Sequence, residues 1–185
     1  MGETGGELRI ETSRLALRAW RDADAAALLA VCTDPVVMEF LGGVQDRAAV
    51  DAALDRQRGF QRDFGHCFWA VERQQDGAVL GFCGLKPGAE GTPLEGRVEI
   101  GWRLARHAWG QGYAFEAARA SLDWGFAELA TDAIHAMTVP GNVRSWGLME
   151  RLGMRRCPDE DFAHPAFAPG HPLRPHIVYR IDRPH

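Results

Sequence analysis

A strand that runs through a two-glycine turn into a helix is the strongest constraint in this 185-residue sequence. Residues 97–104 read RVEIGWRL, the turn Gly110-Gln111-Gly112 follows, and an alanine-rich segment begins at Tyr113. The first N–H groups of a helix have no partner inside it, and the helix dipole adds partial positive charge there. Because glycines let a ligand approach the backbone closely, this stretch predicts a binding site for an anion such as a phosphate.

Two common phosphate-binding motifs do not match the turn. The dinucleotide-binding motif needs a third glycine where Phe115 stands. The P-loop needs Gly-Lys-Ser/Thr, whereas Tyr113 and Ala114 follow Gly112 here. The interpretation that remains is a metal-free site for a diphosphate, although two glycines before a helix are by themselves more often plain turn residues.

Hydrophobic periodicity predicts six strands. The strand at 97–104 places Val98 and Ile100 on one face and Glu99 on the other. Asp76-Gly77 between two apolar runs predicts a β-hairpin. Residues 86–96, with two prolines and three glycines, predict a mobile loop. The expected strands are 15–20, 67–72, 78–85, 97–104, 134–139 and 176–180.

Capping residues predict the helices between the first two strands. We expect Asp22 to cap a helix through Cys32, and Asp34-Pro35 to begin a short helix through Met38. A longer helix is expected from Asp46 to Gly65. These helices would leave a surface suited to holding an acceptor molecule.

Two more helices are expected after residues 112 and 141, the second capped by Asn142 and closed by Gly153. Their apolar residues recur at the spacing of an amphipathic helix. The expected core contacts of the helices are Val50, Leu54, Phe64, Phe115, Leu122, Phe126, Leu129, Trp146, Met149 and Leu152.

Composition limits the function classes. The length fits one domain, 1–185, with a core of about 11–183 and a flexible segment 1–7. The net charge of −4 argues against nucleic-acid binding. Cys32, Cys67, Cys83 and Cys157 lack metal-ligand or disulfide spacing and are expected to be core thiols. Because we find no signal peptide and no membrane-spanning run, we expect a cytoplasmic protein.

Four segments together resemble the GNAT superfamily of N-acetyltransferases. They are His107–Gly112, Glu116–Ala118, Asn142–Ser145 and Glu150–Met154. The first is similar to the family's (Arg/Gln)-x-x-Gly-x-(Gly/Ala) loop for the pyrophosphate of acyl-CoA, with histidine where Arg or Gln is usual. The resemblance covers about residues 11–183.

The branch looks like the RimJ/RimL type, which acetylates protein N-termini or small amines. Thr12–Arg18, Asp34–Met38 and Trp109–Ala117 carry this likeness. It implies an α/β fold: a single GNAT domain whose mixed, mostly antiparallel central sheet splays between the two strands that hold acyl-CoA, with helices on both faces.

The resemblance implies acetyl-CoA as acyl donor, without a metal. Its pyrophosphate would meet the amides from Trp109 to Ala114, and its pantetheine arm would bond strand backbone between 98–104 and 134–139. The implied cofactor-binding residues are Trp102, Leu104, His107, Trp109, Gly110, Gln111, Gly112, Tyr113, Ala114, Asn142 and Arg144.

Acetyl transfer needs a neutral amine, which a carboxylate base can provide. Glu99 is the candidate, because the strand before the loop carries the base in many GNAT enzymes; a salt-bridged strand glutamate is the alternative. Asn142 would bond the pantetheine or the amine. Ser145 is the candidate to protonate the leaving thiolate, with an ordinary helix-start serine as the alternative.

The sequence leaves the acceptor open. Protein N-termini, amino acids, polyamines and antibiotics all remain, with a mild lean toward cationic acceptors from the net charge. A non-catalytic acyl-CoA sensor and a ribosome-associated binding protein are the alternative functions. His164, His171 and His176 fit no compact ligand set and are expected at the acceptor entrance at most. A homodimer is neither required nor excluded.

Overall fold

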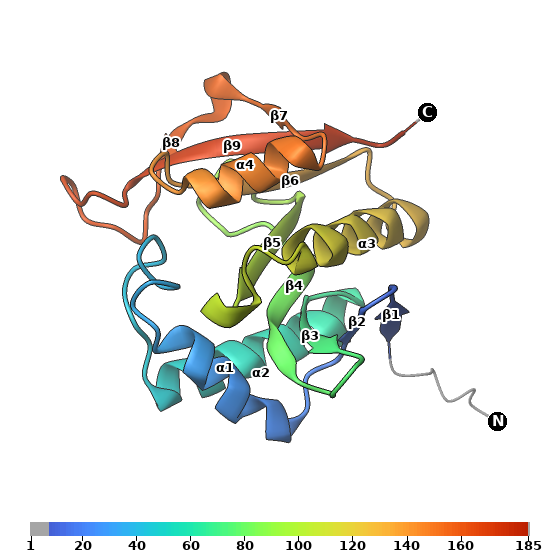
Figure 1. The fold of residues 1–185 in the computed structure, drawn as a ribbon. Helices are drawn as coiled ribbons and strands as arrows, with labels where there is room; N and C mark the ends of the chain where they lie inside the picture. Colours follow the sequence, from blue (N-terminus) through green and yellow to red (C-terminus); the bar gives the residue numbers. More distant parts are fainter. Residues whose placement is uncertain (1–7, 185) are drawn as a thin grey trace.

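The computed structural model describes residues 8–184; the segment 1–7, expected to be flexible, lies outside them. The chain forms one open sheet with four α-helices (Figure 1). The strands are β1 Arg9–Glu11, β2 Leu15–Arg18, β3 Phe68–Arg73, β4 Val79–Pro87, β5 Val98–Leu104, β6 Ala133–Thr138, β7 Arg155–Arg156, β8 Phe162–Ala163 and β9 Pro175–Asp182. The helices are α1 Ala25–Cys32, α2 Arg47–Phe64, α3 Tyr113–Glu128 and α4 Val143–Arg151.

The sheet is mixed and mostly antiparallel, as predicted. Its order is β1-β2-β3-β4-β5-β6-β9-β7, with β8 paired to β9. Neighbouring strands are antiparallel except β5 and β6, which run parallel with α3 as their connection. The strands β1, β7 and β8, of two or three residues, were not predicted. Runs this short carry too few residues for an alternation signal.

The parallel pair β5–β6 separates after a short contact. Cα pairing joins only Val98 to Ile134 and Glu99 to His135. On its other edge, β5 is paired with β4 along its whole length, from Pro87–Val98 to Gly81–Leu104. On the β6 side, the part of β5 after Glu99 therefore lacks a strand partner, which is the predicted splay.

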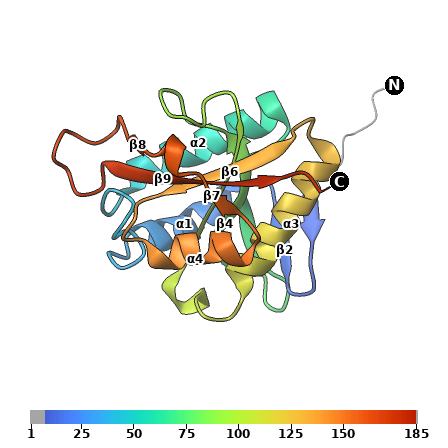
Figure 2. The same cartoon turned by 90° about the horizontal axis from the view of Figure 1, so that it is seen from above.

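Helices cover both faces of the sheet (Figures 1 and 2). Helix α3 packs on one face, where a Cβ built at Gly125 would lie 2.3 Å from Leu85 Cδ1. On the same face, Tyr179 of β9 donates its hydroxyl to Glu150 of α4. Helix α1 lies on the opposite face, where Cys32 contacts Arg103 of β5.

Helix α2 matches its prediction closely, with one exception. Asp46 accepts a hydrogen bond from Ala49 N–H at its start, and Gly65 ends it in the left-handed conformation. Its hydrophobic side chains are buried at Val50 but not at Phe64, which is 56% exposed. The prediction that Phe64 is a core residue was wrong: its ring lies beside Phe60 and His66 at the end of α2, and these neighbours leave more than half of it exposed. Phe115 is likewise exposed, since α3 buries the neighbouring positions instead.

The region before α2 differs from its prediction. Asp22 does not cap α1: its side chain is exposed and pairs with Arg58. The helix begins at Ala25 behind a 3₁₀ turn, and Asp24 in that turn forms a bidentate ion pair with Arg18 of β2. This buried pair attaches α1 to the sheet.

The segment after Asp34-Pro35 forms turns instead of the expected short helix. The Asp34 carboxylate accepts from Val36 N–H, and Met38 N–H bonds Asp34 carbonyl, which closes one turn that does not continue. Burial of Met38 and Val37 fixes this turn against the core. Phe40 and Leu41, which come shortly after this turn, line the pocket where β5 and β6 part.

The four cysteines are free and buried, as expected. Burial raises the pKa of Cys67 to about 12, as it does for Cys83. Within residues 8–184, no helix is long and apolar enough to cross a membrane. The loop 86–96 is partly strand, since β4 continues to Pro87, and its Leu94 is fully buried.

Candidate active site

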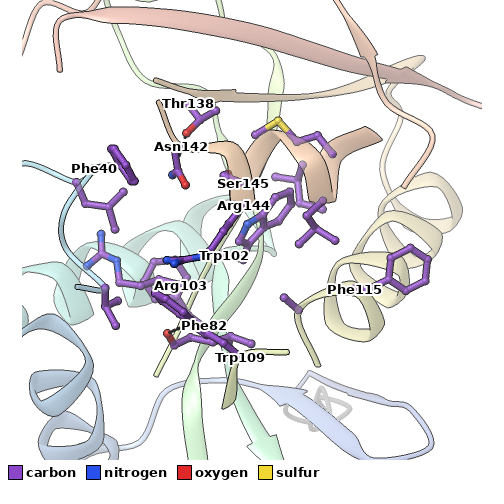
Figure 3. Close-up of a pocket in the computed structure, with 18 of the residues that line it drawn as sticks. Phe40, Phe82, Trp102, Arg103, Trp109, Phe115, Thr138, Asn142, Arg144 and Ser145 are labelled. Atoms are coloured by element: carbon purple, nitrogen blue, oxygen red, sulfur yellow. Dashed lines mark hydrogen bonds between the residues drawn. The ribbon is translucent and has the colours of Figure 1, made fainter. Parts of the chain in front are cut away.

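A pocket of about 740 Å³ opens where β5 and β6 part (Figure 3). It is lined by β5, the turn before α3, the start of α4 and the Val36–Leu41 segment. Most of the predicted site residues line it; His107 and Gln111 do not. The predicted residues in its wall are Glu99, Trp102, Leu104, Trp109, Gly110, Gly112, Tyr113, Ala114, Asn142, Arg144 and Ser145.

The turn before α3 presents unpaired backbone donors. Gly110 and Gly112 adopt left-handed conformations with φ of 72° and 81°. Within the described chain, the N–H groups of residues 110–115 have no intramolecular acceptor, and the first bond into the turn is from Glu116 N–H to Gly112 carbonyl. Trp109 N–H, by contrast, already bonds Arg106 carbonyl. The free donors therefore begin at Gly110, one residue later than expected.

Glu116 attaches the turn before α3 to residues 12–14, which connect β1 and β2. Its carboxylate accepts from the hydroxyl of Thr12 at 2.6 Å, the N–H of Arg14 at 2.9 Å and the Nε of Arg14 at 2.6 Å. Arg14 also donates to Gln111 carbonyl at 2.9 Å. Burial would raise the pKa of Glu116, but these hydrogen bonds outweigh it and lower the pKa. The sequence motif contained Glu116 but gave it no role.

Trp109 connects the turn to both neighbouring walls of the pocket. Its indole Nε1 donates to Leu104 carbonyl at 2.8 Å. The guanidinium of Arg144, at the start of α4, lies 4.7 Å from its ring centroid. This contact keeps an exposed arginine beside the free amides, where an anion would gain from it.

Asn142 and Ser145 lie at the start of α4 with their side chains free of the helix. Asn142 is the N-cap residue, but its amide makes no capping bond and instead donates to Thr138 Oγ1 at 3.2 Å. The Ser145 hydroxyl has no protein partner among residues 8–184. Both side chains are therefore available to a ligand, and the expected capping role of the Asn142 side chain is absent.

Glu99 lies at the point where β5 leaves β6. It is 7% exposed, and its Oε2 accepts from Lys86 Nζ at 2.5 Å. Register places Lys86 of β4 directly beside it. Burial raises the pKa of Glu99, against the opposing effect of the Lys86 charge. The salt-bridged alternative considered for Glu99 is thus present in part, yet Glu99 also lines the pocket.

Two stacked phenylalanines form the floor of the pocket on the α1 face. The rings of Phe68 and Phe82 lie 5.3 Å apart at 7°. Gly101 makes this possible, because a Cβ there would lie 2.5 Å from Phe68 Cζ. Lys86 Nζ lies 5.4 Å from the Phe68 centroid, and Arg103 Cζ lies 5.2 Å from that of Phe82.

An aromatic loop reaches the same end of the molecule. His164 and His176 have ring centroids 4.6 Å apart, and Phe167 stacks on His171 at 4.9 Å. Burial lowers the pKa of His164, with a further lowering from Lys86. Of these residues, His176 lines the pocket. Among the residues that the structure describes, no group of three or more His, Cys, Asp or Glu side chains could hold a metal ion.

Three features of the site were not predicted. His107 lies outside the pocket, and its carbonyl accepts from Gln111 Nε2 at 2.7 Å. Lys86 and Arg103 were assigned no role. Because Lys86 meets Glu99 only through the register of β4 against β5, no local pattern signals it.

Comparisons with known proteins agree on one family. The acetyltransferase (GNAT) domain model matches residues 14–155. Two relatives from Bacillus subtilis (strain 168) are "Uncharacterized protein YkkB", 35% identical over 79% of this chain and 84% of the relative, and "Uncharacterized N-acetyltransferase YnaD", 31% identical over 80% and 84%. The crystal structure of an acetyltransferase from Agrobacterium tumefaciens str. C58 superposes with a TM-score of 0.77 at 27% identity, covering 98% of each chain.

Proposed function

Because the chain belongs to the GNAT acetyltransferase family, we propose that it transfers an acetyl group from acetyl-CoA to a primary amine. The observation that carries this proposal is the parting of β5 from β6 beside the free N–H groups of residues 110–115. A long thioester with a diphosphate suits such a pocket, since strand backbone can bond its arm and a helix start can bind its phosphates.

In this proposal the diphosphate binds the amides from Gly110 to Ala114, with Arg144 as the nearby cation. The pantetheine arm follows β5 past Trp102, where the strand has no partner on the β6 side. The thioester then lies between Asn142, which follows the end of β6, and Glu99, where β5 and β6 still pair. Glu116 supports this arrangement indirectly by fixing the turn.

Glu99 acts as the general base, directly or through a water. Its carboxylate takes a proton from the ammonium form of the acceptor, and the neutral amine attacks the thioester carbonyl. A backbone N–H of β5 stabilises the oxygen of the tetrahedral intermediate. Burial raises the pKa of Glu99, and the nearby Lys86 charge opposes this effect by favouring the ionised form that a base needs.

Collapse of the intermediate breaks the carbon–sulfur bond and releases CoA thiolate, which needs a proton or a strong hydrogen bond. The chain has two tyrosines, at 113 and 179. Tyr179 already donates to Glu150, and Tyr113 is buried at the start of α3. Ser145, whose hydroxyl has no protein partner in the described chain, is the proposed donor.

The branch of the family, the compartment and the absence of a metal are parts of the same proposal. We propose a RimJ/RimL-like enzyme that works in the cytoplasm with an amine acceptor and without a metal. A non-catalytic acyl-CoA sensor would bind acetyl-CoA but acetylate nothing, and a ribosome-associated protein without CoA would not bind it.

Acetyl-CoA binding is tested by thermal unfolding. A ligand that binds only the folded state at a hundredfold excess over its Kd adds about 2.7 kcal/mol of stability. Stabilisation by acetyl-CoA supports the proposal, and its absence at millimolar concentration contradicts it. A panel of amines, followed by release of free thiol, then separates an enzyme from a sensor.

Glu99→Gln tests the base. Acetyl-CoA should stabilise this variant as it does the parent, while turnover falls by roughly 10²–10⁴-fold. The loss should be largest at low pH, where less of the amine is neutral without help. Unchanged turnover across pH would remove Glu99 from the mechanism. Ser145→Ala, with normal turnover, would limit Ser145 to a structural role.

A further inference from the structure

Within residues 8–184, the guanidinium of Arg103 forms no ion pair with a carboxylate. Arg103 lies on β5 on the same face as Glu99, and its side chain lines the pocket beside Phe82 (Figure 3). The only hydrogen bond of its side chain among residues 8–184 is from Nη1 to Cys32 Sγ at 3.2 Å. Its Nε is buried with no partner, the only arginine nitrogen in the described chain of which this is true.

A guanidinium with a buried, unpaired nitrogen is energetically unfavourable. A guanidinium has five N–H donors and is always charged. Thiol sulfur is a weak acceptor, and a buried donor left without a partner destabilises the protein. The buried Arg18 and the half-buried Arg97, by contrast, have carboxylate partners in Asp24 and Glu160. An anion from the ligand would supply the partner that Arg103 lacks.

The charges of the residues that line the pocket also favour an anionic ligand. Among the described residues, Glu99 is the only acidic one that lines the pocket, and Lys86 already neutralises it. Arg103, Arg144 and Arg151 all line the wall. The local charge is therefore positive although the whole chain carries −4, so the lean toward cationic acceptors taken from net charge finds no support in the pocket.

The two faces of the sheet separate Arg103 from the turn before α3. Arg103 reaches toward Cys32 of α1, on the face opposite α3 and α4. Arg144 and the free amides of residues 110–115 belong to the other side, at the starts of α4 and α3. Acetyl-CoA phosphates thus have their own cation and donors, which leaves Arg103 for the second substrate.

Glu99 and Arg103 lie at the two ends of one stretch of the pocket floor. They are four residues apart on one face of β5, so their Cα atoms are separated by roughly 13 Å. Between them lie Gly101 and the stacked Phe68–Phe82 pair. An acceptor can present its amine at Glu99, lay an apolar segment on the rings and place an anionic group at Arg103.

We propose that the acceptor is a primary amine that carries an anionic group, carboxylate or phosphate, and that Arg103 binds this group. The proposal rests on the proposed acetyltransferase function and deepens it. It excludes polyamines and other purely cationic amines as preferred acceptors, because these would bring a second positive charge toward an unpaired guanidinium.

The test compares matched acceptor pairs on the parent enzyme and on Arg103→Gln. The pairs are ε-aminocaproate with ε-aminocaproamide, and aminohexyl phosphate with aminohexanol, whose methylene chains can lie on the rings; spermidine is added as a polycation. The parent should favour one or both anionic members by roughly ten- to a hundredfold in kcat/KM, the range for a hydrogen bond to a charged group. Whichever pair shows the preference identifies carboxylate or phosphate as the bound group.

Arg103→Gln should abolish this preference while KM for acetyl-CoA stays within about twofold, since the phosphates bind elsewhere in the proposal. Arg103→Lys should retain part of it, because charge remains but the planar fork is lost. Arg62→Gln, at an exposed arginine of α2 paired with Asp63, is the matched control and should keep it fully. A preference that survives Arg103→Gln, a raised KM for acetyl-CoA alone, or a parent that favours spermidine would overturn the proposal.

A binding measurement separates this proposal from the proposed function. With CoA present, N-acetyl-ε-aminocaproate and N-acetyl-ε-aminocaproamide are titrated calorimetrically, together with N-acetyl-aminohexyl phosphate. Tighter binding of an anionic product to the parent than to Arg103→Gln supports the anion site even if no amine is acetylated. Equal binding to both proteins overturns it, even if acetyl transfer is observed.

Discussion

Replacement of Gly112 by valine tests the diphosphate site directly. Gly112 has φ of 81°, where an L-residue costs about 1–2 kcal/mol, and a β-branched residue fits this conformation poorly. A Cβ there would lie 3.3 Å from Arg14 Nη2, the end of a flexible side chain that can move. The free energy of unfolding should thus fall by at least about 1–2 kcal/mol, and Tm by roughly 2–8 °C.

The same backbone penalty can be reproduced away from the pocket. Gly77, in the turn between β3 and β4, has φ of 73° and nothing within 4 Å of a built Cβ. Gly77→Val should therefore destabilise the protein to a similar extent without touching the amides before α3. The two variants share the strain and differ in their position relative to the proposed ligand.

The assay is thermal unfolding with and without acetyl-CoA. At a concentration that gives the parent about 2.7 kcal/mol of added stability, Gly77→Val should gain the same amount. Gly112→Val should gain little, because its side chain adds bulk where residues 110–115 present their free N–H groups. If both variants gain equally, no anion binds close to Gly112 and the proposed cosubstrate site is wrong.

Three further changes test other parts of the structure. Lys86→Met should move the acid limb of the pH profile of kcat/KM to higher pH, since loss of the ammonium raises the pKa of Glu99 further; an unmoved limb argues against Glu99 as base. Asp24→Asn should lower the free energy of unfolding in urea by about 1.5–3 kcal/mol, because Arg18 would lose its bidentate carboxylate partner and keep only its ion pair with Glu72; an unchanged free energy of unfolding would contradict this. Burial lowers the pKa of His135, so the folded state binds this proton less readily than the unfolded chain, and stability present above about pH 6.5 is lost as the pH falls. His135→Leu should consequently lose less stability than the parent between about pH 7.5 and about pH 5.5 in urea titrations, and equal losses would show that other groups cause the dependence.

Local signals in the sequence predicted much of the fold. Asp46 and Gly65 fix the ends of α2 through a side-chain cap and a left-handed glycine, both of which act within four residues. Asp76-Gly77 likewise set the hairpin between β3 and β4. Where a feature depends only on near neighbours in the chain, residue types suffice to predict it.

Sequence signals gave wrong predictions where contacts between distant residues compete with local preference. Asp34-Pro35 has the residues of a helix start, but the burial of Met38 fixes a turn there instead. Phe64 has the spacing of a core residue, yet its neighbours in the tertiary structure, Phe60 and His66, leave it mostly exposed. Periodicity says which residues share a face, and only the packed neighbours decide whether that face is buried.

The site divides in the same way. The sequence by itself determined the family and the glycine turn before α3, and it named Asn142 and Ser145 as candidates, because these lie in short contiguous motifs; Glu99 was named for its place on the strand before that turn. Only the tertiary structure showed that β4 brings Lys86 to Glu99 and that, within residues 8–184, Arg103 has no charged partner. Ion pairing depends on strand register and on which helix covers which face, and these are set by contacts between residues far apart in the chain.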